Sequence, residues 1–238
     1  MKKLHSALSL LPVICTGLLL LGCSKQYKDQ DGNLFNSVTI GNQEWMAENL
    51  NVVTFRNGDS IPLAKTKEEW ENAAVEGRPV YCIYDINPGD NSKTGKLYNW
   101  YAFNDSRMIA PKGWHIPSDR EWIELSVELG MSPAEAEKLH ERGTDQGTRL
   151  KDPGDRSWNL SDSISVNFSG FNALAGGCRL NDGEYYMANV IAVFWSSTET
   201  ETGGAYAYGI HPAPFFNRCD DNKGLGMSVR CIKDKQAL

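Results

Sequence analysis

Long apolar runs are missing from most of this 238-residue sequence. A helix that spans a bilayer needs roughly 20 mostly apolar residues, and only the stretch from Leu4 to Leu21 approaches that length. Histidine, serine and threonine interrupt it, so the stretch is too short and too interrupted to span a membrane comfortably. We therefore expect the chain that follows it to be soluble.

Histidine is scarce, and common catalytic motifs are missing. Only His115, His140 and His211 follow the apolar stretch, and they form neither a His-Glu-x-x-His motif nor a pair at helical spacing. Ser196 and Ser197 lack the Gly-x-Ser-x-Gly turn that presents the nucleophile of α/β-hydrolases. We expect His115 and the two serines to form local hydrogen bonds, and we expect the chain not to be an enzyme.

Basic residues are outnumbered, because 24 Lys and Arg stand against 30 Asp and Glu, a formal net charge of −6. Binding to phosphates needs a concentrated basic face, so we do not expect nucleic acid as a partner. Residues 35–230 also lack any proline-, serine- or charge-rich tract that would separate two domains. We expect a single globular domain.

The N-terminus has the features of a lipoprotein signal peptide. Lys2 and Lys3 precede the apolar stretch, which ends in Leu-Leu-Gly-Cys at residues 20–23 and resembles a lipobox. We expect residues 1–22 to be removed and Cys23 to be acylated, since two or three acyl chains give a stable anchor. The alternative is a plain secretory peptide with an incidental cysteine.

The residues after Cys23 bear on location. Ser24 stands where many inner-membrane lipoproteins have a retaining aspartate, which favours the outer membrane, with the domain at the cell surface or on the periplasmic face. Residues 23–33 are polar and mixed in charge, so we expect a flexible tether. The globular domain then covers residues 34–238.

The residue pattern predicts an α+β fold. Apolar residues at 35–40 lead to Gly41-Asn42 and then to 43–46, which indicates an N-terminal hairpin. Ser118 begins a capping box, Ser-Asp-Arg-Glu, that predicts a helix over 119–129. A second, shorter helix is expected from Pro133. Further short elements are expected, as one or two helical turns at 67–73 and as strands at 79–84, 193–196, 206–210 and 227–232.

Four cysteines remain beyond Cys15 and Cys23, namely Cys82, Cys178, Cys219 and Cys231. In an exported protein such cysteines favour disulfides. The residues themselves allow three pairings and do not choose among them. A structural zinc site is the alternative, although no two of the four have the C-x-x-C spacing that such sites prefer.

Five blocks of sequence, in order along the chain, carry a family resemblance. They are Trp-Met-Ala-Glu-Asn-Leu at 45–50, Gly-Lys-Leu-Tyr-Asn-Trp-Tyr-Ala at 95–102, Ala-Pro-Lys-Gly-Trp-His-Ile-Pro-Ser-Asp-Arg-Glu-Trp at 110–122, Trp-Ser-Ser-Thr at 195–198 and Gly-Met-Ser-Val-Arg-Cys at 226–231. Together they resemble the signature blocks of the Fibrobacter succinogenes major paralogous domain (FISUMP) family, from about Phe35 to Asp234.

The resemblance implies a single domain with a C-type-lectin-like fold, related to formylglycine-generating enzymes and sulfatase-modifying factors. We accordingly expect two short helices, small twisted antiparallel sheets and much irregular loop. Members are typically secreted or lipid-anchored proteins of Gram-negative bacteria and have no established general activity.

The resemblance also implies a disulfide pairing. Cys82 and Cys231 fall where many members carry cysteine, so a bridge between them is expected. The joint presence of Cys178 and Cys219 then suggests a second pair. Many members have a cysteine where this chain has Ala110, so that alternative bridge to Cys231 is excluded. In the chain-entropy model, closing loops of this length contributes roughly 4 to 5 kcal/mol.

Two enzymes with related folds have requirements that this chain does not meet. A formylglycine-generating oxidase needs a close pair of reduced cysteines to hold copper, whereas Cys219 and Cys231 stand well apart in the sequence. An iron-dependent sulfoxide synthase needs a cluster of histidine ligands. A divergent enzyme of this superfamily is therefore the second alternative to the function that we expect.

That function is recognition of a glycan or a protein outside the cell, without a cofactor. The tryptophans inside the family blocks are expected in the core, and the aromatic side chains expected to bind ligand lie in the C-terminal third: Tyr185, Tyr186, Tyr206, Tyr208, Phe215 and Phe216. The first alternative is a structural subunit of a surface assembly or adhesin.

Two smaller features remain open. Asp220, Asp221 and Asn222 could supply oxygen ligands to calcium, but a short acidic turn is usually just solvated. Asp-Ser-Ile at 59–61 and at 162–164 resembles a bacterial O-glycosylation acceptor, which would place Ser60 and Ser163 on exposed turns.

Overall fold

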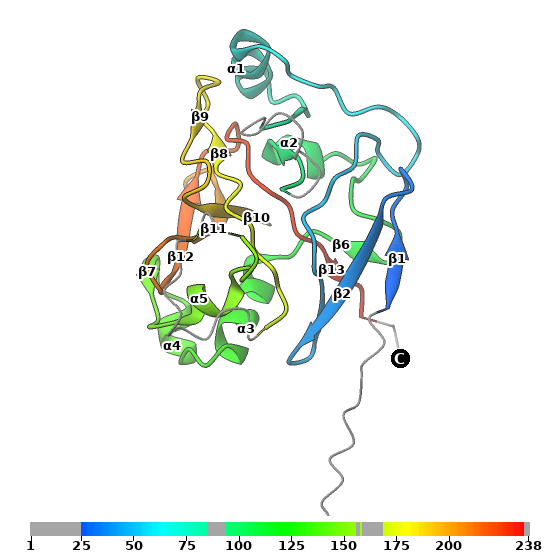
Figure 1. Cartoon of the computed structure of the whole chain (residues 1–238). Helices are drawn as coiled ribbons and strands as arrows, with labels where there is room; N and C mark the ends of the chain where they lie inside the picture. The colour runs from blue at the N-terminus through cyan, green and yellow to red at the C-terminus, as the bar shows by residue number, and fades with distance from the viewer. Residues whose placement is uncertain (1–24, 85–93, 156–157, 159–168, 236–238) are drawn as a thin grey trace, which may run out of the picture.

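The computed structural model describes residues 25–84, 94–155, 158 and 169–235. Short helices and small antiparallel sheets make up this part of the chain, which confirms the expected α+β class (Figure 1). The predicted signal peptide, Cys23 and Ser163 lie outside the described residues. Among the helices that are described, none is long and apolar enough to cross a membrane.

A five-stranded sheet is built around the predicted N-terminal hairpin. β2 (Leu34–Ile40) and β3 (Gln43–Met46) pair across Gly41, whose φ of 58° suits the tight turn. β13 (Ile232–Lys233) pairs with β3 and with β6 (Trp114–His115). The end of the described chain therefore returns to the hairpin near its beginning.

The segment before the hairpin differs from the flexible tether expected there. β1 (Gln26–Lys28) pairs antiparallel with β2, and the Tyr27 ring packs edge-on against Trp114 with ring centroids 5.1 Å apart. Polar residues flank Tyr27, as is usual for an edge strand. Their polarity resembles that of a linker, and the packing of one aromatic ring was not visible in the sequence.

The second large sheet has the strand order β10-β11-β12-β7. Its strands are β7 (His140–Arg142), β10 (Ala192–Glu199), β11 (Ala205–Ile210) and β12 (Phe216–Asp221). On one face Trp195 and Ala207 join the largest apolar cluster, and on the other Phe194 and Tyr208 join a second cluster beneath the main helix. Because both faces are covered, this sheet is the centre of the domain.

The described chain has five short helices where two were expected. The predicted helix is α3 (Asp119–Glu128), with its capping box formed by Ser118 and Glu121, and the predicted shorter helix is α4 (Pro133–Ala136). The others are α1 (Lys67–Glu76), α2 (Trp100–Phe103) and α5 (Gln146–Leu150). α1 begins where it was predicted, after a second capping box formed by Thr66 and Glu69, and it continues to Glu76, where Gly77 with a φ of 65° ends it.

Two small sheets complete the fold. β4 (Tyr81–Cys82) pairs with β5 (Leu97–Tyr98), and β8 (Cys178–Arg179) pairs with β9 (Tyr185–Tyr186). The strands predicted at 193–196 and 206–210 are confirmed by β10 and β11. In the stretch predicted at 227–232, only the last residue belongs to a regular strand, and Met227 and Ser228 pair through isolated bridges.

Tryptophans form the core, as expected for those inside the family blocks. Trp122 of α3 stacks on Tyr208 with centroids 4.8 Å apart and contacts Trp45 at the same distance. Several indole N–H groups also donate to backbone carbonyls of distant segments, as Trp100 does to Ser196 at 3.1 Å and Trp195 to Tyr98 at 2.9 Å. Each such tryptophan fills the core and satisfies a buried carbonyl.

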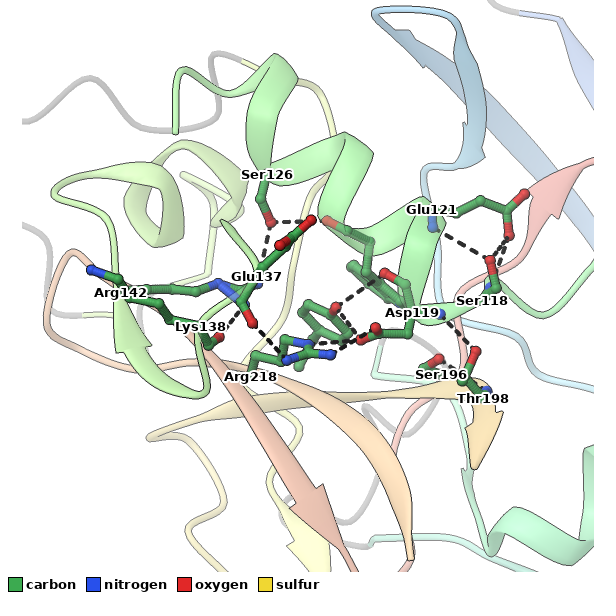
Figure 2. A network of polar contacts seen from close by, with 12 residues as sticks. Ser118, Asp119, Glu121, Ser126, Glu137, Lys138, Arg142, Ser196, Thr198 and Arg218 are labelled. Atoms are coloured by element: carbon green, nitrogen blue, oxygen red, sulfur yellow. Dashed lines mark hydrogen bonds and ion pairs between the residues drawn. The ribbon is translucent and has the colours of Figure 1, made fainter. Parts of the chain in front are cut away.

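A buried ion pair fixes the start of α3 on the central sheet. Figure 2 shows the Arg218 guanidinium of β12 facing Asp119, with Nε and Nη2 donating to the two carboxylate oxygens at 2.8 and 2.7 Å. The Tyr208 hydroxyl donates to the same carboxylate at 2.7 Å. The side chains of Arg218 and Asp119 are only 8% and 12% exposed, so water screens the pair weakly.

We expect Asp119→Ala to lower the free energy of unfolding by about 3–5 kcal/mol, because it leaves the Arg218 charge buried without its partner. Urea unfolding measures the change. Arg120→Ala is the control, because it breaks an exposed pair with Glu124 and should cost below about 1 kcal/mol. Equal losses in the two variants would contradict the role of the buried pair.

Candidate functional site

The six aromatic residues expected to bind ligand do not form one site. Tyr208 and Phe216 are 0% exposed, so the prediction is wrong for both, because these positions of β11 and β12 face the cluster beneath α3. Tyr206 is half-buried and lies under the Arg218 guanidinium, 4.0 Å from its ring centroid. Phe215 is half-buried in the turn between the same two strands, beside His211.

Tyr185 and Tyr186 are exposed, and they belong to a group that we call the β9 ridge. Its members are large apolar side chains with exposed fractions between 37% and 47%, namely Ile83, Tyr185, Tyr186, Met187 and Val190. The Tyr185 hydroxyl donates to the Ile83 carbonyl at 3.0 Å, and the Val190 amide donates to the Met187 carbonyl at 3.1 Å. These bonds join Tyr185 to the Ile83 segment and close the turn from Met187 to Val190.

Arg179 of β8 supports the ridge from beneath. The central carbon of its guanidinium lies 4.8 Å from the ring centroids of both Trp70 and Tyr185. Tyr84 in turn stacks on Tyr185, with centroids 4.3 Å apart and planes 16° from parallel. The ring of Tyr185 is thus fixed by stacking as well as by its hydroxyl, and a fixed ring loses little entropy when a ligand binds.

The same guanidinium joins three stretches of backbone. It donates from Nε to the Gly183 carbonyl at 3.0 Å, from Nη1 to Ala64 at 2.9 Å and from Nη2 to Thr66 at 2.8 Å. Arg179 is 2% exposed, and no described carboxylate contacts it. No pattern in the sequence marks this arginine, because its partners are carbonyls of residues far along the chain.

The loop that carries the ridge has an unusual backbone. Met187 and Asn189 have φ angles of 52° and 57°, in the left-handed region that side chains other than glycine rarely occupy. Such conformations persist only where the surrounding contacts enforce them. The ridge is therefore a preformed surface of aromatic and aliphatic side chains that can pack against a ligand.

One comparison with known proteins identifies a family. The family model of the Fibrobacter succinogenes major domain matches residues 38–233. The chain belongs to this family. No curated protein and no solved structure matches it. The β9 ridge thus belongs to a Fibrobacter succinogenes major domain, and the resemblance seen in the sequence is confirmed.

All four cysteines of this Fibrobacter succinogenes major domain beyond Cys23 are described, and all are free thiols. Neither predicted disulfide is therefore present. Cys82 packs with Trp70 in a small cluster near α1, whereas Cys231 lies in the largest cluster, so the members of the first predicted pair occupy different parts of the core. Burial raises the pKa of the Cys82 thiol to about 11, which disfavours its reactive thiolate.

The candidate calcium turn is occupied by internal hydrogen bonds. The two oxygens of Asp220 accept from the hydroxyls of Thr200 and Thr202 at 2.8 and 2.5 Å, and Asn222 accepts from the Gly224 amide at 2.8 Å. Within the described residues, no three His, Cys, Asp or Glu side chains come together as metal ligands. Ser60 is exposed on its turn, and its glycosylation stays a prediction.

The expected local hydrogen bonds of His115 and Ser196 are confirmed. Ser196 accepts from the Thr198 amide at 3.1 Å. His115 lies between two carboxylates, with Nε2 2.9 Å from Glu121 and Nδ1 2.7 Å from Asp234. Both ring nitrogens can donate only in the protonated form. The hydrogen bond to Glu121, with a further one to Asp234, outweighs burial and raises the pKa of His115.

His115 therefore stabilises the fold in its protonated form. Its contribution is complete below the unfolded pKa of about 6.5 and is lost as the pH rises through the higher folded value. We expect His115→Gln to destabilise the domain at pH 6 and to cost progressively less at alkaline pH. Unfolding measured across this range tests it, and a loss that does not vary with pH would contradict it.

Proposed function

We propose that this Fibrobacter succinogenes major domain is a binding module of the cell envelope, without catalytic activity, that takes a glycan or a protein ligand on the β9 ridge. The observation that carries the proposal is the exposure of Tyr185 and Tyr186 on one hairpin, with the ring of Tyr185 fixed against Arg179. Aromatic rings pack well against the apolar faces of sugar rings and act as anchors in protein interfaces.

The position of the ridge supports an extracytoplasmic role. The described chain enters at β1, on the lower right of Figure 1, whereas β9 lies at the upper left, at the other end of the molecule. If Cys23 is acylated and attached to the outer membrane, this arrangement turns the ridge away from the lipid surface. A ligand at the cell surface, or on the periplasmic face, then has open access to it.

A lectin-like fold is part of the proposal. Small antiparallel sheets, short helices and long loops held by side chains agree with the C-type-lectin-like architecture implied by the family resemblance. In such folds ligand-binding loops project from a fixed scaffold. The β8–β9 hairpin, with its buried arginine, has this character.

The test uses the mature domain from Lys25 onward on a glycan array and against a panel of purified outer-membrane proteins. We expect Tyr186→Ala to weaken binding of the recognised ligand by about 30-fold or more, as the loss of an interface anchor does. Leu139→Ala, which removes an exposed apolar side chain elsewhere, is the matched control and should bind like the wild type.

Two outcomes would count against the proposal. Ligand binding that survives in Tyr186→Ala would remove the ridge as the binding site. Self-association of the wild type that disappears in Tyr186→Ala, without any ligand bound, would favour a structural subunit of a surface assembly, because exposed Met187 and Val190 could also bury against another copy.

A further inference from the structure

A pocket of about 340 Å³ lies away from the β9 ridge, between the N-terminal hairpin and residues 172–174. This volume is at the small end of the range of about 300–1,000 Å³ for small-molecule sites. Amides and carboxylates make up about half of the lining, and apolar side chains, with Leu34 and Leu174 among them, make up the rest.

In each of three polar side chains of the lining, one polar atom has a hydrogen-bond partner and the other has no described partner. Asn51 accepts through Oδ1 from the Lys96 ammonium at 2.5 Å, which leaves its Nδ2 as a donor. Asn33 donates through Nδ2 to Asp29 at 2.8 Å, which leaves its Oδ1 as an acceptor. Asp152 accepts through Oδ1 from the Gly154 amide at 2.7 Å, which leaves Oδ2. The existing hydrogen bond fixes the orientation of each side chain and therefore the position of its second polar atom.

A buried arginine joins the two walls of the pocket. Arg230 is 0% exposed and donates to Asn49 Oδ1 and to the Met46 carbonyl at 3.1 Å on the hairpin side. Across the pocket it donates to the carbonyls of Phe171 and Asn172. Because Met46, Asn49 and Asn172 all line the pocket, one guanidinium fixes its shape before any ligand arrives.

The charges of the lining select the chemistry of the occupant. Asp29, Glu48 and Asp152 place three carboxylates around the space, and an anionic ligand would be repelled by them. Nor do the described residues form a three-ligand metal cluster here or elsewhere. The carboxylates of Asp29 and Glu48 already accept hydrogen bonds from Asn33 and Asn36, so a cationic ligand would find only the Asp152 oxygen without a described partner. One amide donor and two acceptors are better complemented by hydroxyls, each of which can both donate and accept.

We propose that this pocket binds a single neutral sugar residue. Hydroxyls of the sugar accept from Asn51 Nδ2 and donate to Asn33 Oδ1 and Asp152 Oδ2. Leu34, which is 62% exposed, and Leu174 offer carbon surface to the C–H face of the ring. The site and its ligand go beyond the β9 ridge, and neither depends on binding there.

The test is a titration of the mature domain with glucose, galactose, mannose and fucose, followed by NMR chemical shifts, with glucuronate as the charged comparison. We expect saturable millimolar binding of at least one neutral sugar and weaker binding of glucuronate. Asn51→Asp replaces the free donor by an acceptor without changing the shape, and should weaken binding at least tenfold. Asp152→Asn should weaken it as well.

The controls separate this site from the proposed ridge. Asn104→Asp, at an exposed position outside the pocket, should leave the affinity unchanged, and so should Tyr186→Ala. Unchanged thermal unfolding of the two pocket variants shows that they fold. The proposal is overturned if no neutral sugar binds, if glucuronate binds more tightly than glucose, or if Asn51→Asp and Asp152→Asn both bind like the wild type.

Discussion

The need to satisfy buried carbonyls of irregular backbone is the constraint on which this structure depends. Loops cannot pair their own polar groups as helices and sheets do, and an unpaired buried carbonyl costs free energy. Here long side-chain donors reach across the molecule to them. Arg179 serves three carbonyls, Arg230 serves three more, and indole N–H groups serve others, such as that of Trp70 to Gly224.

This use of arginine explains why both candidate binding surfaces are preformed. Arg179 lies beneath the β9 ridge, and Arg230 lies behind the polar pocket. Among the described residues, neither arginine contacts a carboxylate. The N–H donors of each planar guanidinium bond instead to backbone and amide oxygens. A lysine would keep the charge, but its donors all radiate from one nitrogen and could not span acceptors as far apart as those that the planar guanidinium contacts. The two buried guanidinium groups thus hold the loops in place, and the candidate binding surfaces on those loops are rigid for the same reason.

Local signals in the sequence predicted the parts of the fold that local interactions decide. The capping box of Ser118 and Glu121 predicted α3, and the Gly41-Asn42 turn predicted the N-terminal hairpin. The tryptophans of the family blocks lie in the core as expected. These features depend on residues within one turn or on gross apolar character, which a sequence displays directly.

Long-range contacts decide the rest, and the sequence does not display them. The density of aromatic residues predicts Tyr208 and Phe216 as ligand residues, because it does not distinguish the buried face of a strand from the open one. The pairing of β1 depends on the packing of one ring, Tyr27, against Trp114. Of the expected ligand residues, Tyr185 and Tyr186 are exposed. Arg179, which supports Tyr185, could be found only when distant segments were brought together.

Hydrogen–deuterium exchange of Arg179→Lys tests most directly whether buried arginine forks hold the loops. The account predicts faster amide exchange in residues 64–66 and in the β8–β9 hairpin, whose carbonyls lose their donors, with β10, β11 and β12 unchanged. Unchanged exchange in the hairpin, or a uniform increase through the central sheet, would contradict it.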